Sequence, residues 1–344
     1  MGQGGSLFGR AGGLRRTGVA IARALAGIAF AVAAGAAAAE SADPAAWPPR
    51  PVKVIVPFAP GGPDVVARLI AQQLTARLGR PFVVENRPGA NGIIGADLVA
   101  KAAADGCTLL ITSSSIVVNP SVHRSLPFDT ARDFTPVTDL TYVDGLVLTV
   151  HPDLPAHSLG ELIEWGRRSG SRIAYGSPGV GNQIHVASAL FARLSGLDLV
   201  HVPYKGAGPA MSALVGGEIQ MLLITPPMSL PYVRAGKARA LAYTAATRAA
   251  FLPAVPTAAE SGLPGFVIDG GWYGLFAPAG LPASLLEQIY RSARAALEDP
   301  ATRERIVALG VAPSGRRPEE FRALFEADLR RYAEVVRTAG ITPE

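Results

Sequence analysis

The chain has 344 residues, of which 49% are hydrophobic and 17% are charged, and its formal net charge is +5. This composition is typical of a globular protein of about two domains and excludes a generally disordered chain. Four arginines and no acid lie in residues 1–39, so removing these four charges from +5 leaves +1. A near-neutral remainder without a block of Lys and Arg excludes a nucleic-acid-binding surface.

Residues 1–39 have the pattern of an export signal. A basic segment, GRAGGLRR, precedes the small apolar segment ALAGIAFAVAAGAAAA, and the alanines at 37–39 fit the small-residue cleavage rule. The sequence therefore predicts a periplasmic protein secreted through a cleavable signal. The Arg-Arg pair at 15–16 leaves the twin-arginine route open beside ordinary secretion. An uncleaved membrane anchor is the alternative interpretation.

Neither a metal nor a cofactor is expected. Cys107 is the only cysteine, which excludes an intrachain disulfide and a cysteine-based metal site. The five histidines are scattered without metal-ligand spacing. No complete G-x-G-x-x-G or G-x-x-x-x-G-K-[ST] motif occurs, so a nucleotide site is not indicated.

The first predicted elements alternate between strands and helices. Apolar runs predict buried strands at 52–57, 81–86 and 108–113, and periodic patterns predict helices at 64–79 and 93–104. This βαβαβ order implies a mostly parallel sheet with helices on both faces.

The middle of the chain repeats the scheme, and its end is helical. Strands are predicted at 145–151, 172–177, 199–204, 219–225 and 238–244, and helices at 158–170, 182–196 and 208–217. A long extended segment at 266–280 is expected to cross between domains. Three helices then begin near prolines, at 282–299, 300–310 and 318–340. Two such units, the second inserted in the first, would give two lobes and a cleft.

Three strand-to-helix turns resemble one another, and they are PFAPGGPD at 57–64, YGSPGVGNQIH at 175–185 and VPYKGAGPAM at 202–211. Each places glycines where a strand meets the N-terminus of a helix, and such an N-terminus attracts an anion. A single turn of this kind is more simply a chain reversal. Three such turns together favour a shared binding site, and a carboxylate would match the backbone N–H donors of these turns.

Other residues have two open interpretations. The serines at 113–115 either offer hydroxyl groups to a ligand or form a solvated loop. Asp64 either faces the ligand or accepts from the first turn of its own helix. Lys205 either pairs with an anionic ligand or extends into water. His185 faces the cleft or is structural, and with Ser177 it gives an alternative function, a secreted hydrolase.

Several motifs in order carry a family resemblance. The most specific are PFAPGG, ENRPGA and HVPYKG, and the likeness runs from about residue 51 to the C-terminus. The chain resembles the Bug-type substrate-binding proteins of the tripartite tricarboxylate transporter family, which are TctC-like. The resemblance implies an α/β type II periplasmic binding-protein fold, in which each lobe is a mixed, mostly parallel sheet flanked by helices and the ligand binds between the lobes.

Carried onto this sequence, the resemblance gives lobe boundaries and a site. Lobe 1 would comprise residues 45–145 and 270–344, and lobe 2, inserted, residues 146–269. No catalysis is implied. A monomer would capture a small organic carboxylate (a di- or tricarboxylate, an amino acid or an aromatic acid) and deliver it to membrane transporter subunits or signal to a sensor protein. The expected ligand-binding residues are Phe58, Gly61, Gly62, Asp64, Ser113, Ser177, Gly179, Gly181, Asn182, His185, Tyr204 and Lys205.

Two departures from the family pattern lie at positions that are expected to bind the ligand. The GGPD segment is one residue shorter than usual between the double glycine and the aspartate, and it places Pro63 where a donor is expected. Asn182 stands where the family often has serine. Both changes are expected to shift the solute or weaken its binding.

Overall fold

A computed structural model describes residue 1 and residues 47–169, 173–338, 341 and 343. The compact unit Trp47–Glu344 is described here by itself. The predicted signal at 1–39 lies outside the described residues apart from Met1. None of the described helices is long and apolar enough to cross a membrane.

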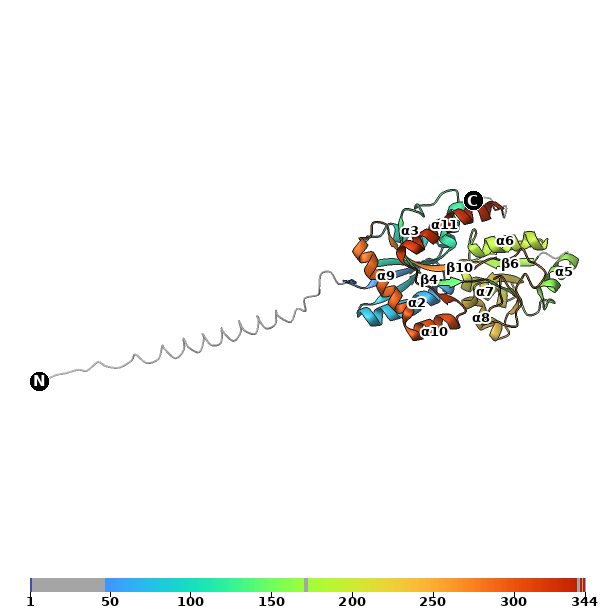
Figure 1. The fold of residues 1–344 in the computed structure, drawn as a ribbon, viewed down its shortest axis with the longest axis horizontal. Coiled ribbons are helices and arrows are strands. Elements are labelled where there is room, and N and C mark those ends of the chain that lie inside the picture. The colour runs from blue at the N-terminus through green and yellow to red at the C-terminus, as the bar shows by residue number, and fades with distance from the viewer. Residues whose placement is uncertain (2–46, 170–172, 339–340, 342, 344) are drawn as a thin grey trace. The chain divides into compact units, whose positions relative to one another are not determined.

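The described residues form two mixed α/β sheets with flanking helices (Figure 1). The first is six-stranded, and its strands across the sheet are β11 (Ala312–Pro313), β4 (Phe134–Val143), β10 (Gly271–Pro278), β3 (Thr108–Ser113), β1 (Val52–Val56) and β2 (Phe82–Asn86). The second is five-stranded, with β7 (Leu199–Pro203), β6 (Ile173–Ser177), β8 (Met221–Ile224), β5 (Val147–Val150) and β9 (Arg239–Tyr243).

Strand directions confirm the predicted mixed, mostly parallel sheets. In the first sheet β1 pairs in parallel with β2 and β3, while β10 is antiparallel to β3 and β4, so β4 shares the direction of β1. In the second sheet β6 is parallel to β7 and β8, and only β5 opposes its neighbours β8 and β9. We call each sheet with its helices the six-stranded half and the five-stranded half.

Helices cover both faces of the first sheet. On one face α2 (Gly62–Leu78) packs with α9 (Ala283–Glu298) and α10 (Pro300–Ala308), and Figure 1 shows them on one side of the strands. On the other lie α3 (Ile93–Ala100), α4 (Ser115–Val122) and α11 (Pro318–Thr338). Each face has its own cluster of buried apolar side chains, which is the packing an open α/β sheet requires.

The five-stranded half has one large apolar core and a smaller apolar cluster around Val147 and Tyr243. Its helices are α5 (Leu159–Ser169), α6 (Gln183–Ser195), α7 (Ala207–Val215) and α8 (Pro226–Arg234). Fully buried Leu148, Phe191 and Leu222 belong to this core. Strands buried on both faces explain why these segments are continuous apolar runs in the sequence rather than alternating ones.

Local signals explain the boundaries of α2. Pro63 lies in its first turn, where a missing N–H costs nothing, and Gly79 ends it with a left-handed φ of 64°. The helix was expected from Asp64 and starts two residues earlier. Five described elements were not predicted: β4, α4, α8, β11 and the short 3-10 helix Ala90–Gly92.

The extended segment at 266–280 is partly irregular. Only β10 is a strand, and the residues before it pass from one sheet to the other. Ile268 N donates to Thr244 O beside β9, and Gly270 N donates to Val143 O at the end of β4. The chain therefore passes between the two sheets at 268–270, and it also passes between them from β4 to β5.

Candidate functional site

A cavity lies where strands of both halves end. β1 and β3 end at Val56 and Ser113, and β6 and β8 end at Ser177 and Ile224. Ligands of open α/β sheets bind beyond such carboxyl ends. The residues that line this inner cavity are Phe58, Ala59, Gly61, Gly62, Pro63, Ser113, Ser115, Pro178, Asn182, Gln183, Ile184, Ala207, Thr225, Gly270 and Tyr273.

A second, larger space adjoins the inner cavity. The inner cavity has a volume of about 40 Å³, and this outer hollow one of about 370 Å³. The outer hollow is lined by Phe58, Gly89, Ala90, Asn91, Gly92, His123, Pro178, Gly179, Val180, Pro203, Tyr204 and Lys205. Since Phe58 and Pro178 line both spaces, these two side chains form the wall between them.

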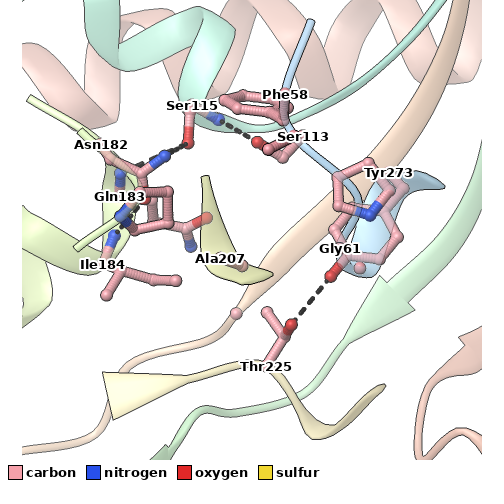
Figure 2. A pocket seen from close by; sticks show the side chains of 15 residues that line it. Phe58, Gly61, Ser113, Ser115, Asn182, Gln183, Ile184, Ala207, Thr225 and Tyr273 are labelled. Carbon is pink, nitrogen blue, oxygen red and sulfur yellow. Dashed lines mark hydrogen bonds between the residues drawn. The ribbon is translucent and has the colours of Figure 1, made fainter. Parts of the chain in front are cut away.

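The side chain of Asn182 joins the two halves. Its Nδ2 donates to Asn91 Oδ1 at 2.9 Å and to Ser115 Oγ at 2.8 Å, and all three residues are buried. Figure 2 shows the bond between Ser115 and Asn182 as a dashed line beside the cavity. Asn91 in turn donates to Asn119 Oδ1 at 2.7 Å, which fixes the orientation of its amide.

Gln183 makes a second connection. Its Oε1 accepts from Ser114 Oγ at 2.5 Å in the six-stranded half, and its Nε2 donates to Asp269 O at 3.1 Å in the crossing segment. Asp269 is itself held by Arg331 of α11, whose Nη1 lies 2.8 Å from its Oδ2. One side chain at the N-terminus of α6 thus contacts the opposite half and the segment that connects the two halves.

A third connection between the halves is a hydrogen bond between two residues that line the cavity. The Tyr273 hydroxyl on β10 donates to Thr225 Oγ1, at the start of α8, at 3.0 Å (Figure 2). Burial raises the pKa of Tyr273 to about 12, so the hydroxyl keeps its proton and remains a donor. The same oxygen lies against Gly62, where an added Cβ would be 2.2 Å away. Only glycine fits at position 62.

The first and third glycine turns meet directly. Ala59 N donates to Lys205 O at 3.3 Å, and a Cβ added at Gly208 would lie 2.4 Å from Pro60 O. The backbones of the two halves therefore approach each other more closely than any side chain would allow.

The helix N-termini around the cavity differ in their free donors. Gly61 and Gly206, which precede α2 and α7, make no side-chain capping bond. By contrast α6 is capped by Asn182, whose Oδ1 accepts from Ile184 N at 2.9 Å. The N–H of Asn182 also donates to Gly179 O. These two donors of the second turn are thus engaged within the protein.

Ser177 lies under the cavity rather than in its wall. It is fully buried, and its Oγ lies 2.6 Å from His201 Nε2 on β7. Burial, with a smaller effect of the neighbouring His185, lowers the pKa of His201 to about 4. The His185 ring stacks on that of His201 at 4.0 Å, and its Nδ1 accepts from Gly181 N. Ser177 is thus paired with His201, not with His185 as the hydrolase alternative required.

The remaining predicted site residues occupy three places. Gly179, Tyr204 and Lys205 line the outer hollow and not the inner cavity. Asp64 is buried beside the first turn, and its carboxylate contacts Arg68, with Oδ2 3.0 Å from Nε. Gly181 carries a φ of 71° and packs against Val122.

Sequence reasoning did not single out several residues of the wall. Ser115 was included only in the serine run, whose solvated-loop interpretation is wrong because Ser114 and Ser115 are buried and α4 begins there. Gln183 and Thr225 were not considered. A signal for Thr225 was present: it stands between a strand and a helix that opens with two prolines, the same arrangement as the glycine turns but without glycine.

Within the described residues, the lining of the inner cavity is neutral and carries several hydrogen-bonding groups. In the described part of the chain, no group of three or more His, Cys, Asp or Glu residues is placed to hold a metal ion. The described lining of the inner cavity has no charged side chain, and its polar groups are hydroxyls, amides and peptide N–H groups.

Comparison with known proteins decides the family. The family profile described as "Tripartite tricarboxylate transporter family receptor", TctC, matches residues 66–341. The chain belongs to this family. BugT of Bordetella pertussis is 39% identical over 314 residues, which are 90% of this chain and 95% of BugT.

Solved structures of similar proteins have the same fold. The periplasmic binding protein BugD is 32% identical with a TM-score of 0.83, covering 87% of this chain and 100% of that one. Rpa4515 of R. palustris, solved with adipate, is 35% identical with a TM-score of 0.83 and the same coverage. The predicted family and the periplasmic binding-protein fold are thus confirmed. TctC proteins are solute-binding receptors, not enzymes, which removes the hydrolase alternative.

Proposed function

We propose that this protein captures a small carboxylated solute in the inner cavity and delivers it to a tripartite tricarboxylate-type membrane transporter. The observation that carries the proposal is a cavity at the carboxyl ends of strands from two sheets, lined by donors and joined across by Asn182. Uncapped helix N-termini supply partial positive charge to an anion there. The adipate bound to Rpa4515 supports a carboxylate as the ligand.

The two halves are the lobes of the proposed receptor. Lobe 1 comprises residues 45–145 and 270–344, and lobe 2 comprises 146–269. The separation of β1–β4, β10 and β11 from β5–β9 supports these limits. The lobes separate to admit the ligand and close over it, and the closed form is the one a membrane partner recognises.

The predicted residues have different roles in this proposal. Phe58, Gly61, Gly62, Ser113 and Asn182 contact the solute in the inner cavity. Gly179, Tyr204 and Lys205 line its entrance through the outer hollow. Asp64, Ser177, Gly181 and His185 hold the turns in place. Residues 1–39 direct the chain to the periplasm and are removed, leaving a monomer.

Thermal melting with a panel of di- and tricarboxylates, amino acids and aromatic acids tests the proposal. A ligand at about 100 times its Kd that binds only the folded state adds roughly 2.7 kcal/mol of stability. We expect at least one carboxylate to raise the Tm and to reduce the radius of gyration measured by X-ray scattering. If no carboxylate does either, the receptor function is wrong. Native mass spectrometry of the purified protein identifies a retained solute.

A further inference from the structure

Arg331 on α11 contacts two carboxylates that lie outside the cavity. Its Nη1 lies 2.8 Å from Asp269 Oδ2, and its Nε donates to Asp328 Oδ1 at 3.0 Å. None of these three described residues lines the inner cavity or the outer hollow. An effect of Arg331 on the cavity therefore has to pass through other residues, and each carboxylate begins a chain of contacts that reaches the wall.

The first chain passes through the segment 268–270. Asp269 Oδ1 accepts from Gly271 N at 3.0 Å while its Oδ2 contacts Arg331, so both carboxylate oxygens hold this turn. The carbonyl of Asp269 accepts from Gln183 Nε2 at 3.1 Å. Gln183 and Gly270 both line the inner cavity, and Figure 2 draws Gln183 in its wall. The ion pair with Arg331 thus fixes the carbonyl that orients one end of the Gln183 amide.

The second chain reaches the same amide from its other end. Asp328 is 4% exposed, and its Oδ2 accepts from Trp272 Nε1 at 2.8 Å. The carbonyl of Trp272 accepts from Ser114 N at 2.9 Å, and Ser114 Oγ donates to Gln183 Oε1 at 2.5 Å. The two chains therefore form a closed ring of contacts that begins and ends at Arg331.

The ring packs closely around Gly271. A Cβ added there would lie 2.0 Å from Ser114 Oγ and 2.8 Å from Gln183 Oε1. The amide has one orientation in this ring, because turning it by 180° would bring its oxygen against the carbonyl oxygen of Asp269. In such close packing a shift of one member displaces the next. The orientation of Gln183 thus depends on the whole ring.

Arginine suits its position in the ring. A guanidinium group is always charged and has five donors in one plane, so it can hold two carboxylates in a fixed geometry. Within the described residues, Arg331 is the only cation paired with Asp269 or Asp328. Loss of the guanidinium would leave two partly buried carboxylates without a counter-charge. One substitution at Arg331 would therefore loosen both chains of contacts.

We infer that Arg331 is a positioning residue for solute binding, which acts through this ring on the Gln183 amide. The inference rests on the proposed function and deepens it, because it assigns part of the solute affinity to a residue of α11 that does not contact the solute. The ring stabilises the arrangement in which Gln183 contacts Ser114 across the two halves. Without Arg331 this arrangement is less favoured, and a contiguous network of this kind carries the effect to the site.

The side-chain amide signals of Gln183 test the positioning without a ligand. In the nuclear magnetic resonance spectrum of ¹⁵N-labelled protein, they are the pair that is absent from Gln183→Ala. We expect Arg331→Met to shift them. Arg337→Met is the control, since it removes an exposed ion pair with Glu334 on the same helix, and we expect it to leave them in place. Unshifted Gln183 signals in Arg331→Met overturn the inference.

Solute affinity tests the consequence for binding. Titration calorimetry with a carboxylate from the panel that binds gives the Kd of each variant. We expect Arg331→Met and Asp269→Asn to raise the Kd at least about fivefold, and Arg337→Met to change it less than about twofold. Asp269→Asn keeps an oxygen for Gly271 N, so it removes the ion pair from a protein whose turn is intact even where Arg331→Met folds poorly. An unchanged Kd in Asp269→Asn overturns the inference.

A double-mutant cycle separates positioning from a general loss of stability. If Arg331 acts through Gln183, Arg331→Met raises the Kd by a smaller factor in the Gln183→Ala protein than in the unchanged one. Equal factors in both proteins overturn the inference and leave the receptor function standing. If no carboxylate binds the unchanged protein, the proposed function is wrong, and the inference that rests on it is wrong as well.

Discussion

Asn182 Nδ2 lies 2.8 Å from Ser115 Oγ, and this bond links the N-terminus of α6 to that of α4 in the other half. The same amide donates to Asn91 Oδ1, while its oxygen caps α6 through Ile184 N. One side chain therefore stabilises a helix and the contact between the halves. Asn182, where the sequence was expected to depart from the family pattern, is thus one of several residues that join the two halves.

Two substitutions of Asn182 separate these roles. Asn182→Ser keeps a capping oxygen, so we expect a free energy of unfolding close to that of the unchanged protein but a more open average state, because serine is too short to reach Asn91. Asn182→Ala loses the cap as well, and we expect a further loss of about 1 kcal/mol. Urea unfolding measures stability and X-ray scattering without ligand measures opening. A compact Asn182→Ser protein would show that these bonds do not hold the halves together.

The sequence predicted most of the elements because their signals are local. Val52–Val56 is a buried apolar run, and Gly79 ends α2 as a left-handed cap, so neither needs a distant partner to be recognised. The elements that were missed have mixed signals. Pro120 interrupts α4 and Pro231 interrupts α8, and both helices form because their buried faces pack on the sheets.

The site was predictable only in part, because its wall depends on contacts across the chain. Gly61 and Gly62 were found from their position between a strand and a helix. Gln183 lines the cavity because Ser114, 69 residues away, fixes its amide. No periodicity or spacing in the sequence relates these two residues. The pairing of Ser177 with His201 likewise depends on the register of β6 beside β7.

The contact between Gly62 and Tyr273 gives a prediction of coupling. Gly62→Ala places a Cβ 2.2 Å from the Tyr273 hydroxyl oxygen, and we expect a loss of about 1–3 kcal/mol in the free energy of unfolding. Tyr273→Phe removes that oxygen, so the same substitution should cost less in the Tyr273→Phe protein. A double-mutant cycle by urea unfolding measures the difference. Additive losses would contradict the contact.

The approach of Gly208 to Pro60 predicts an effect on binding. Gly208→Ala places a Cβ 2.4 Å from Pro60 O, a backbone atom that cannot turn aside. We expect the closed arrangement to be disfavoured and the Kd of any bound carboxylate to rise at least about tenfold, with little change in the stability of each half. Gly160→Ala on α5 is the control, since the nearest atom to its added Cβ would be Ser158 Oγ, 4.0 Å away. Equal Kd values for the two variants would refute the role of this approach.

The environment of His201 predicts how stability depends on pH. Its pKa falls from 6.5 to about 4 because burial and His185 disfavour the charged ring. Between these values the unfolded chain binds a proton that the folded protein does not, so stability falls as the pH drops from 6.5 to 4 and this contribution then stops changing. We expect a loss on the order of 1–2 kcal/mol, since partial exposure screens the effect. His201→Gln should flatten this part of the profile, measured by urea unfolding at each pH. An unchanged slope in that variant would assign the pH dependence to other groups.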